Sequence, residues 1–446
     1  MHRRDSWSYP IAVAVAVMAL PAAGADNTAA PNDSDSDRQV SQLVHQLNDD
    51  AATQRDAAEA RLLELAGTNA ATSDHFLSLL PPDSDQLPLA VRDRLTRIRK
   101  QVEDRAAKSA VAPTSVTLSA KQMPVFDVFS AIEKQTGNQI VDHRQQAGEE
   151  DRAKQQKLDV AFQNEPFWSA VDKVLDQAQL GVYAYAGADA LAIVEREPGD
   201  GLRHEGAVYS GPFRLEILEV TAQHNLRKPD SKSLKLSLEV AWEPRLRPLA
   251  VSQAAAEVVA TDDAGHKLEL SQPDAVLDAE IPVGTQATEL VLPLALPARD
   301  VAKIASLKGK LRALVPGRQV KFQFDDLAHA AGKTQTSGGV QVTIDAIRKN
   351  NEVWEIHMRL RLDEDNHALE SHRGWAFQNL SYLVDKDGKR IESAGLETTL
   401  QTKNEVGVAY FFDAPKGLDG LTWVYETPAA IVELPIEYEF KDIPLP

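Results

Sequence analysis

The chain has 446 residues, 43% hydrophobic and 26% charged, which is typical of a folded multidomain protein and not of a disordered or membrane-embedded one. Its formal net charge of -18, without a compact basic patch, argues against nucleic acid and anionic lipid surfaces as partners. The lack of cysteine excludes disulfides, thiolate metal sites, a cysteine nucleophile and a lipid-modified N-terminal cysteine.

Residues 1–25 have the pattern of a secretory signal peptide. Arg3 and Arg4 precede an apolar run from Ile11 to Leu20, and Ala23-Gly24-Ala25 provides small residues for cleavage. The apolar run, about ten residues long, is too short to span a bilayer. We therefore expect an exported, periplasmic or secreted protein with no transmembrane segment in the mature chain. Residues 26–37, rich in Asp, Ser and Asn, are predicted to form a disordered spacer.

Residues 38–110 are predicted to form a small helical bundle, because apolar residues recur at helical spacing from Val40 onward. The expected helices after the first cover residues 53–66, 75–80 and 87–108, with Ser73-Asp74 capping the second of these. The segment resembles one HEAT-type helical repeat at Leu47, Asp49, Arg55, Ala58, Leu62, Leu65 and Gly67. A single repeat cannot stack a core by itself, so a bundle packed on its neighbour is the plainer interpretation.

Residues 114–197 contain the same unit twice: a short apolar strand, a polar step ending in proline, an amphipathic helix and a second strand. The first copy has Met123-Pro124 before a helix over Val125 to Thr136, and the second has Asn164-Glu165-Pro166 before a helix over Phe167 to Gln179. A hairpin follows from Tyr183 to Ile193. Two helices and about five short strands predict two helices covering one face of a small mixed sheet.

The order of these features resembles the short N-terminal domain shared by secretins and TonB-dependent receptors. The features are Val116-x-Leu118, Met123-Pro124, Gly137, Ile140-Val141, Leu158-x-Val160-x-Phe162, Asn164-Glu165-Pro166 and Leu180-Gly181. This resemblance implies recognition of periplasmic partners or signal transmission. The chain departs from the usual compact form in a hydrophilic insertion over residues 147–157. Because no secretin pore or outer-membrane barrel follows, pore formation is not carried over.

The rest of the chain alternates as strands do, and two tandem antiparallel β-sandwiches are predicted at residues 207–327 and 338–446. The first contains seven expected strands, at residues 213–220, 234–240, 256–260, 267–270, 289–294, 310–315 and 320–324. Residues 340–347 and 354–360 parallel the first two of these, which favours a diverged duplication. The predicted fold class is therefore multidomain α+β: helical bundle, secretin-type short domain, then two sandwiches.

The sequence predicts no catalytic, cofactor or metal site. It lacks a Gly-x-Ser-x-Gly elbow, a phosphate-binding Gly-rich loop and a zinc-binding H-E-x-x-H helix. A metal interpretation of His357, His367 and His372 with Asp363 to Asp365 is weaker than that of a solvated acidic loop. The tryptophans of the strand region, Trp242, Trp354, Trp375 and Trp423, suit the core between sheets better than a carbohydrate platform.

The two candidate partner contacts are Trp168 and Asn164. Trp168 follows Phe167 but lies off the helix stripe, so it is either exposed beside the first helical turn or packed under the bundle or the 147–157 insertion. We expect a non-enzymatic envelope protein that serves as a protein interaction or scaffold module and docks its partner through the short domain. The alternatives are a carbohydrate- or cell-wall-binding protein and a hydrolase with a dispersed site.

Overall fold

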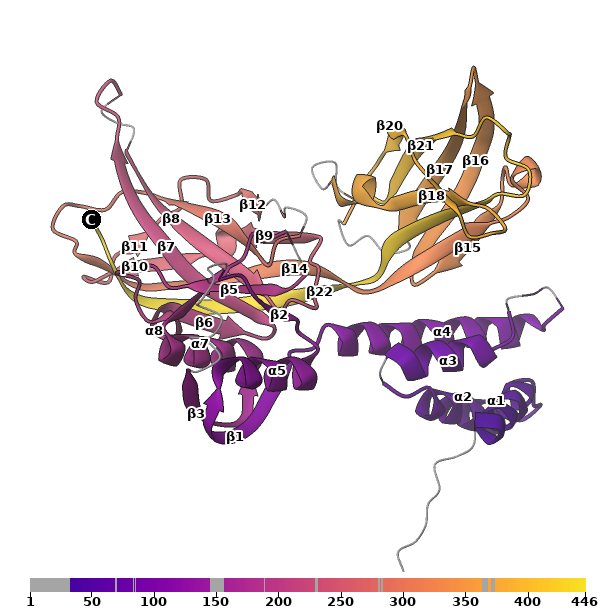
Figure 1. Cartoon of the computed structure of the whole chain (residues 1–446), viewed down its shortest axis with the longest axis horizontal. Helices are drawn as coiled ribbons and strands as arrows, with labels where there is room; N and C mark the ends of the chain where they lie inside the picture. The colour runs from indigo at the N-terminus through magenta and orange to yellow at the C-terminus, as the bar shows by residue number, and fades with distance from the viewer. Residues whose placement is uncertain are drawn as a thin grey trace, which may run out of the picture.

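The computed structural model has a mixed α+β architecture with several antiparallel sheets (Figure 1). It describes residues 33–446 except 69, 83, 85, 145–155, 188, 229–231, 280, 282–283, 363–367 and 370–373. The expected signal peptide, most of the expected spacer and nearly all of the 147–157 insertion lie outside the described residues. None of the helices within the described part of the chain combines the length and apolar character that a membrane-spanning helix needs.

Four helices form the N-terminal segment: α1 (Asp33–Gln46), α2 (Ala52–Leu65), α3 (Ala70–Leu79) and α4 (Leu89–Ala110). Their apolar faces meet in one core that includes Leu47, Leu62 and Ile98. Two predicted starts are wrong. Helix α1 begins within the expected spacer, and α3 begins before Ser73, whose side chain is buried and donates a long hydrogen bond of 3.5 Å to the carbonyl of Ala66 instead of capping a helix.

The short domain repeats the predicted strand–proline–helix unit. Strand β1 (Ser115–Pro124) leads directly into α5 (Val125–Thr136), and β3 (Lys157–Pro166) leads directly into α7 (Phe167–Ala178). Both prolines have a φ near the value that their ring imposes, -54° at Pro124 and -53° at Pro166, which suits the residue before a helix. Strands β2 (Ile140–Asp142), β4 (Leu180–Tyr183) and β5 (Leu191–Glu195) complete the unit.

The strands of the short domain form two sheets, not the single mixed sheet that was predicted. β1 and β3 pair with each other in an antiparallel ribbon, while β5 pairs in parallel with β2 and antiparallel with β4. Helices α5 and α7 lie between the β1–β3 ribbon and the three-stranded sheet (Figure 1). One apolar core joins all three layers, so each helix is covered on two sides.

The first β lobe has a four-stranded sheet in the order β13-β8-β7-β6, with β6 (Ala207–Ser210), β7 (Phe213–His224), β8 (Lys232–Trp242) and β13 (Ala287–Leu294). Short α8 (Arg203–Gly206) precedes it. A second layer contains β9 (Ala250–Ala254), β10 (Val259–Asp262), β11 (Lys267–Leu268) and β12 (Val276–Ala279). The strand predicted at 256–260 is wrong at its start, because residues Ala255–Glu257 form a 3-10 turn that Ala255 anchors in the core.

The second β lobe has a five-stranded sheet in the order β15-β16-β17-β21-β20. Its strands are β15 (Thr334–Ser337), β16 (Val340–Asn350), β17 (Val353–Leu362), β20 (Gly395–Gln401) and β21 (Glu405–Asp413). Strands β18 (Leu380–Val384) and β19 (Arg390–Glu392) form the opposing layer. The run β15-β16-β17-β21 repeats the chain order of β6-β7-β8-β13 in the first lobe.

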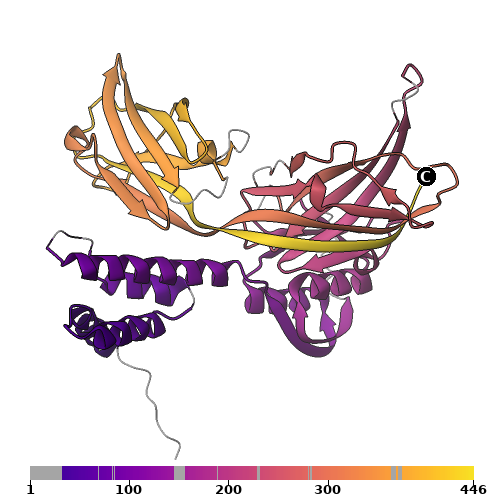
Figure 2. The same ribbon diagram turned by 180° about the vertical axis from the view of Figure 1, so that it is seen from behind.

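Two long strands connect the lobes and belong to both. Strands β14 (Lys303–Phe324) and β22 (Thr422–Pro444) pair antiparallel almost from end to end, and Figure 2 shows them running from one lobe into the other. The end of β22 contributes Ile436, Tyr438 and Phe440 to the core of the first lobe. The end of β14 contributes Phe322 and Phe324 to the core of the second lobe. Each lobe therefore needs a strand from the other half of the chain, contrary to the predicted separation at residues 327 and 338.

The sequence also predicted two strands, at 310–315 and 320–324, where the structure has one. Pro316-Gly317 lies between the two predicted strands, but β14 continues through this pair because β22 provides hydrogen-bonding partners on both sides of it. Helix α4 packs against β14 here: a Cβ at Gly317 would lie 2.5 Å from the Cα of Ala107. Next to it, Arg318 pairs with Glu103 of α4 at 2.8 Å and with Asp74 of α3 at 3.0 Å. The helical segment thus lies against the two long strands midway between the lobes.

Candidate functional site

Helix α7 lies between the short domain's own core and the first β lobe. Its apolar stripe, which includes Val171 and Val174, packs into the short domain. On the side facing the lobe, Trp168 is 2% exposed and its indole Nε1 donates a hydrogen bond of 3.2 Å to the carbonyl of Pro212, between β6 and β7. The hypothesis of an exposed Trp168 is therefore wrong. This side chain bonds to the first lobe, and it lies outside the core of the helical segment.

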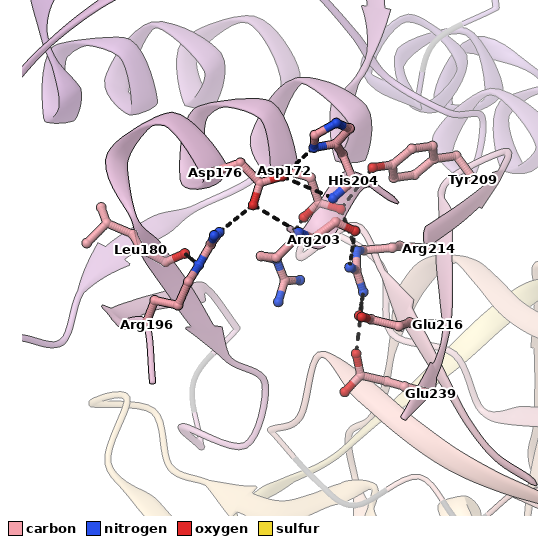
Figure 3. A network of polar contacts seen from close by, with 10 residues as sticks. All are labelled: Asp172, Asp176, Leu180, Arg196, Arg203, His204, Tyr209, Arg214, Glu216 and Glu239. Carbon is pink, nitrogen blue, oxygen red and sulfur yellow. Dashed lines mark hydrogen bonds and ion pairs between the residues drawn. The ribbon is translucent and has the colours of Figure 1, made fainter. Parts of the chain in front are cut away.

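One turn further along α7, Asp172 is fully buried and accepts three hydrogen bonds from α8 and the first β lobe (Figure 3). Arg214 Nε on β7 donates at 2.6 Å, Arg203 Nε on α8 at 2.9 Å and the Tyr209 hydroxyl on β6 at 2.9 Å. A buried carboxylate is stable only if its oxygens are paired in this way. Asp172 is thus the residue that α7 uses to hold the first lobe.

Arg214 is also fully buried and has two further carboxylates around it. Glu216 lies 2.7 Å and Glu239 3.7 Å from its Nη1, and its Nη2 donates to the carbonyl of Arg203 at 3.0 Å (Figure 3). Burial disfavours the guanidinium charge, but the attraction of Asp172 and Glu216 outweighs it and raises the pKa of Arg214. Burial raises the pKa of Glu239 in spite of Arg214. Arg214 is therefore a permanent cation enclosed by three carboxyl groups.

Asp176, one turn beyond Asp172 on the same face of α7, holds the start of α8. It accepts hydrogen bonds from the backbone N–H of Arg203 at 2.9 Å and of His204 at 3.1 Å. The His204 ring Nδ1 lies 2.6 Å away, and Arg196 forms an ion pair with the same carboxylate. Burial favours the neutral acid, but the hydrogen bonds from His204 and Arg203 outweigh it and lower the pKa of Asp176 to about 2.

A second anchor lies at the other end of the short domain. Glu243, 1% exposed after strand β8, accepts hydrogen bonds from the Thr114 backbone N–H at 2.8 Å and the Thr114 hydroxyl at 2.9 Å. Asn138 Nδ2 and Arg245 Nε donate to the same carboxylate at 3.2 and 2.8 Å. Arg245 also donates to the carbonyls of Ala110, the last residue of α4, and of Ala112 just after it. The anchors at Asp172 and Glu243 fix the short domain on the first lobe.

The surface that these anchors leave accessible is the β1–β3 ribbon. Asn164, the second candidate contact, is exposed on β3 and accepts a hydrogen bond of 2.8 Å from the Ser115 hydroxyl. Its φ of 51° and that of Gln122, 52°, mark two irregular positions in the ribbon. The side chains of the ribbon alternate between the core and the outside, and the outer ones are small or polar: Ser115, Thr117, Ser119, Lys121, Lys157, Asp159, Ala161 and Gln163.

A cavity of about 1000 Å³ lies between the two lobes and the β4–β5 hairpin. Its lining includes Trp242 and Trp375, the amides Gln319 and Asn379, and Glu426. Both indoles are buried, at 1% and 7% exposed, so neither is a surface platform for a sugar ring. The lining also holds an ion pair between Arg247 and Asp189 at the exposed rim. Trp423 is fully buried as well, which agrees with the predicted core role of these rings.

The histidine and carboxylate cluster considered in the sequence is outside the described residues at Asp363 to His367 and at His372. His357 is described, and its Nε2 lies 3.0 Å from the carboxylate of Glu355 on the same strand. Among the described residues, no group of three or more His, Asp or Glu side chains is placed to hold a metal ion.

The chain matches no protein family model, and no curated protein matches its sequence. The residues that hold the site together were not singled out from the sequence. Asp172, Arg214 and Glu243 are charged residues that each directly follow an apolar or aromatic residue, as in Val171-Asp172, Phe213-Arg214-Leu215 and Trp242-Glu243. A charge inside a buried run is the signal that could have identified them, since buried charges occur in pairs.

Proposed function

We propose that this chain is a non-enzymatic, exported protein that acts in the cell envelope as an interaction or scaffold module. The short domain is its docking element, as the resemblance to secretin and TonB-receptor short domains implies. The helical segment is a HEAT-like support, and the β lobes are two related sandwiches that exchange strands β14 and β22. The repeated strand order in the two lobes favours their origin by duplication.

The observation that carries this proposal is the division of the short domain into a covered and an accessible side. Helix α7 uses Trp168 and Asp172 to bind the chain's own first lobe. The β1–β3 ribbon lies beyond the helices on the side away from the lobe (Figure 1). The outward side chains of its described residues are small or polar, and an exposed two-stranded ribbon offers backbone groups for strand addition. A partner therefore docks on the ribbon and not on α7.

Substitution of Ser119 tests this assignment. Ser119 is exposed and lies opposite Ala161 in the ribbon, so Ser119→Arg places a long cation at the centre of the proposed docking face. We expect an envelope protein to copurify with the wild type, and the full-length Ser119→Arg variant to lose it with an unchanged melting temperature. The matched control is Ser271→Arg, at an exposed position of the first lobe. Retention of the same copurifying protein by Ser119→Arg would remove the ribbon from the proposal.

A carbohydrate- or cell-wall-binding function is the second candidate, and the cavity between the lobes is the observation that favours it. Amide and carboxyl groups such as Gln319, Asn379 and Glu426 beside Trp375 are the groups that bind hydroxyl-rich ligands. Titration of the full chain with soluble peptidoglycan fragments, followed by tryptophan fluorescence and calorimetry, tests this candidate. Saturable binding that Glu426→Gln weakens would support it, and absence of binding would eliminate it.

A further inference from the structure

The first β lobe has an open side where the edges of its two sheets come close together. Strand β6 is the end strand of the four-stranded sheet. On the other sheet, residues 431–444 of β22 pair with β14, and the pairing of β22 with β18 is confined to residues 422–426. Between these edges runs a groove of about 850 Å³, which we call the β6–β22 groove. Its residues come from α8, β6, β7 and the end of β22.

The floor of the β6–β22 groove is apolar. Val208, Ile217 and Val220 are partly buried against the core of the lobe, and Phe440 and Ile443 belong to that core. Leu218 also lines the groove and is 51% exposed. Covering this leucine with a partner would gain the favourable free energy of burying its apolar surface. The apolar floor thus lies beside a part of β7 that β6 does not pair with.

The backbone of β22 is oriented to receive such a strand. Proline within a sheet occupies positions whose nitrogen faces away from the ladder, and Pro435 lies opposite Arg312 in the β14–β22 pair. Because backbone polar groups alternate in direction along a strand, those of Glu437, Glu439 and Lys441 face outward with Pro435. Their side chains are also exposed.

The charges around the groove are mainly negative. Among the described lining residues, four are carboxylates, Glu205, Glu219, Glu439 and Asp442, and one is a cation, Lys441. Asp442 lies 2.5 Å from Lys303 and Glu439 3.4 Å from Lys308, so these two are already paired. Within the described part of the chain, Glu205 and Glu219 have no ion-pair partner. A bound segment would complement the groove best by adding positive charge beside these two residues.

We propose that the β6–β22 groove binds an extended segment of a partner protein in which apolar residues alternate with lysine or arginine. The segment adds to the outer edge of β22 as a further strand, with its apolar side chains on Leu218 and its basic side chains near Glu205 and Glu219. This surface belongs to the first β lobe, so it is independent of the β1–β3 ribbon and of the function proposed for it.

The probe for this site is a fluorescent peptide of about ten residues in which valine alternates with lysine, long enough for the five or six residues of an ordinary strand. Its matched control alternates valine with glutamate. We expect the full chain to bind the first peptide saturably, and to bind the second at least about tenfold more weakly. Amide exchange should slow at residues 437–441 when the lysine peptide is bound.

Variants complete the test. Leu218→Asp should weaken binding of the lysine peptide by about tenfold or more, as should Glu219→Lys, which alters the rim without touching the floor. Leu226→Asp, at a leucine that is 83% exposed outside the groove, should bind like the wild type. Equal binding of both peptides, or undiminished binding by both groove variants, would overturn the proposal. Dimerisation of the chain that Leu218→Asp abolishes would assign the groove to a second copy and equally overturn it.

Discussion

Replacing Asp172 by asparagine would remove one charge from an ion pair whose two side chains are both fully buried. Breaking such a pair costs about 3–5 kcal/mol, because the remaining charge is left in a poorly solvating environment. Arg214 would keep Glu216 at 2.7 Å, so we expect the lower end of that range, about 3 kcal/mol. This loss of stability should be confined to the junction between α7 and the first lobe.

Amide hydrogen exchange measures this loss in the intact chain. A local destabilisation of about 3 kcal/mol speeds exchange by about 100-fold, and we expect this for α7 and for β7 around Arg214. In an Arg214→Met background the same Asp172→Asn change should cost no more than about 1 kcal/mol, because the fully buried guanidinium is gone and the remaining partner, Arg203, is 19% exposed. Asp93→Asn on the exposed side of α4 is the control. A change below about 1 kcal/mol for Asp172→Asn with Arg214 present would refute this account of the junction.

Three further predictions concern the contact at Gly317, the carboxylate of Asp176 and the end of strand β22. Gly317→Ala should destabilise the packing of α4 on the long strands by about 1–3 kcal/mol, because the new methyl group would collide with Ala107. The control Gly201→Ala has open space around the new methyl group and should have little effect on the melting temperature. The pKa of Asp176 is lowered to about 2 in the folded chain, below the unfolded value of about 3.9. The ionised carboxylate therefore stabilises the fold above pH ~4, and this stabilisation is lost as the pH falls toward 2. In urea unfolding, the Asp176→Asn variant should lack this pH-dependent part of the stability. Deletion of residues 432–446 should raise amide exchange in the first β lobe more than in the second, although the deleted segment follows the second lobe in sequence.

Local patterns in the sequence predicted the short domain better than its surroundings. Pro124 and Pro166 identify both helix starts because their fixed φ and missing N–H act within one or two residues. The face that Trp168 presents was not predictable in the same way. Its environment depends on Pro212, 44 residues later in the chain, and no periodicity within α7 distinguishes a second buried face from an exposed one.

The exchange of strands between the lobes shows a similar limit. The alternation in residues 310–315 and 320–324 correctly indicates strand structure, because side-chain periodicity is a local property. Which lobe buries Phe322 or Phe440 depends on the pairing of β14 with β22, strands whose partners are more than a hundred residues apart in the chain. A proline-glycine pair such as Pro316-Gly317 is typical of a turn, so the sequence does not indicate that β14 continues through it. The charged anchors at Asp172 and Glu243 were missed for the same reason, since their partners are remote in sequence.

Photo-crosslinking inside cells tests the central claim, that the chain covers α7 itself and leaves the β1–β3 ribbon for a partner. A photoreactive phenylalanine analogue would replace Ser119 in one variant and Trp168 in another. We predict adducts between position 119 and another protein, and an intramolecular adduct between position 168 and the turn at Pro212. Partner adducts from position 168 together with none from position 119 would contradict the account.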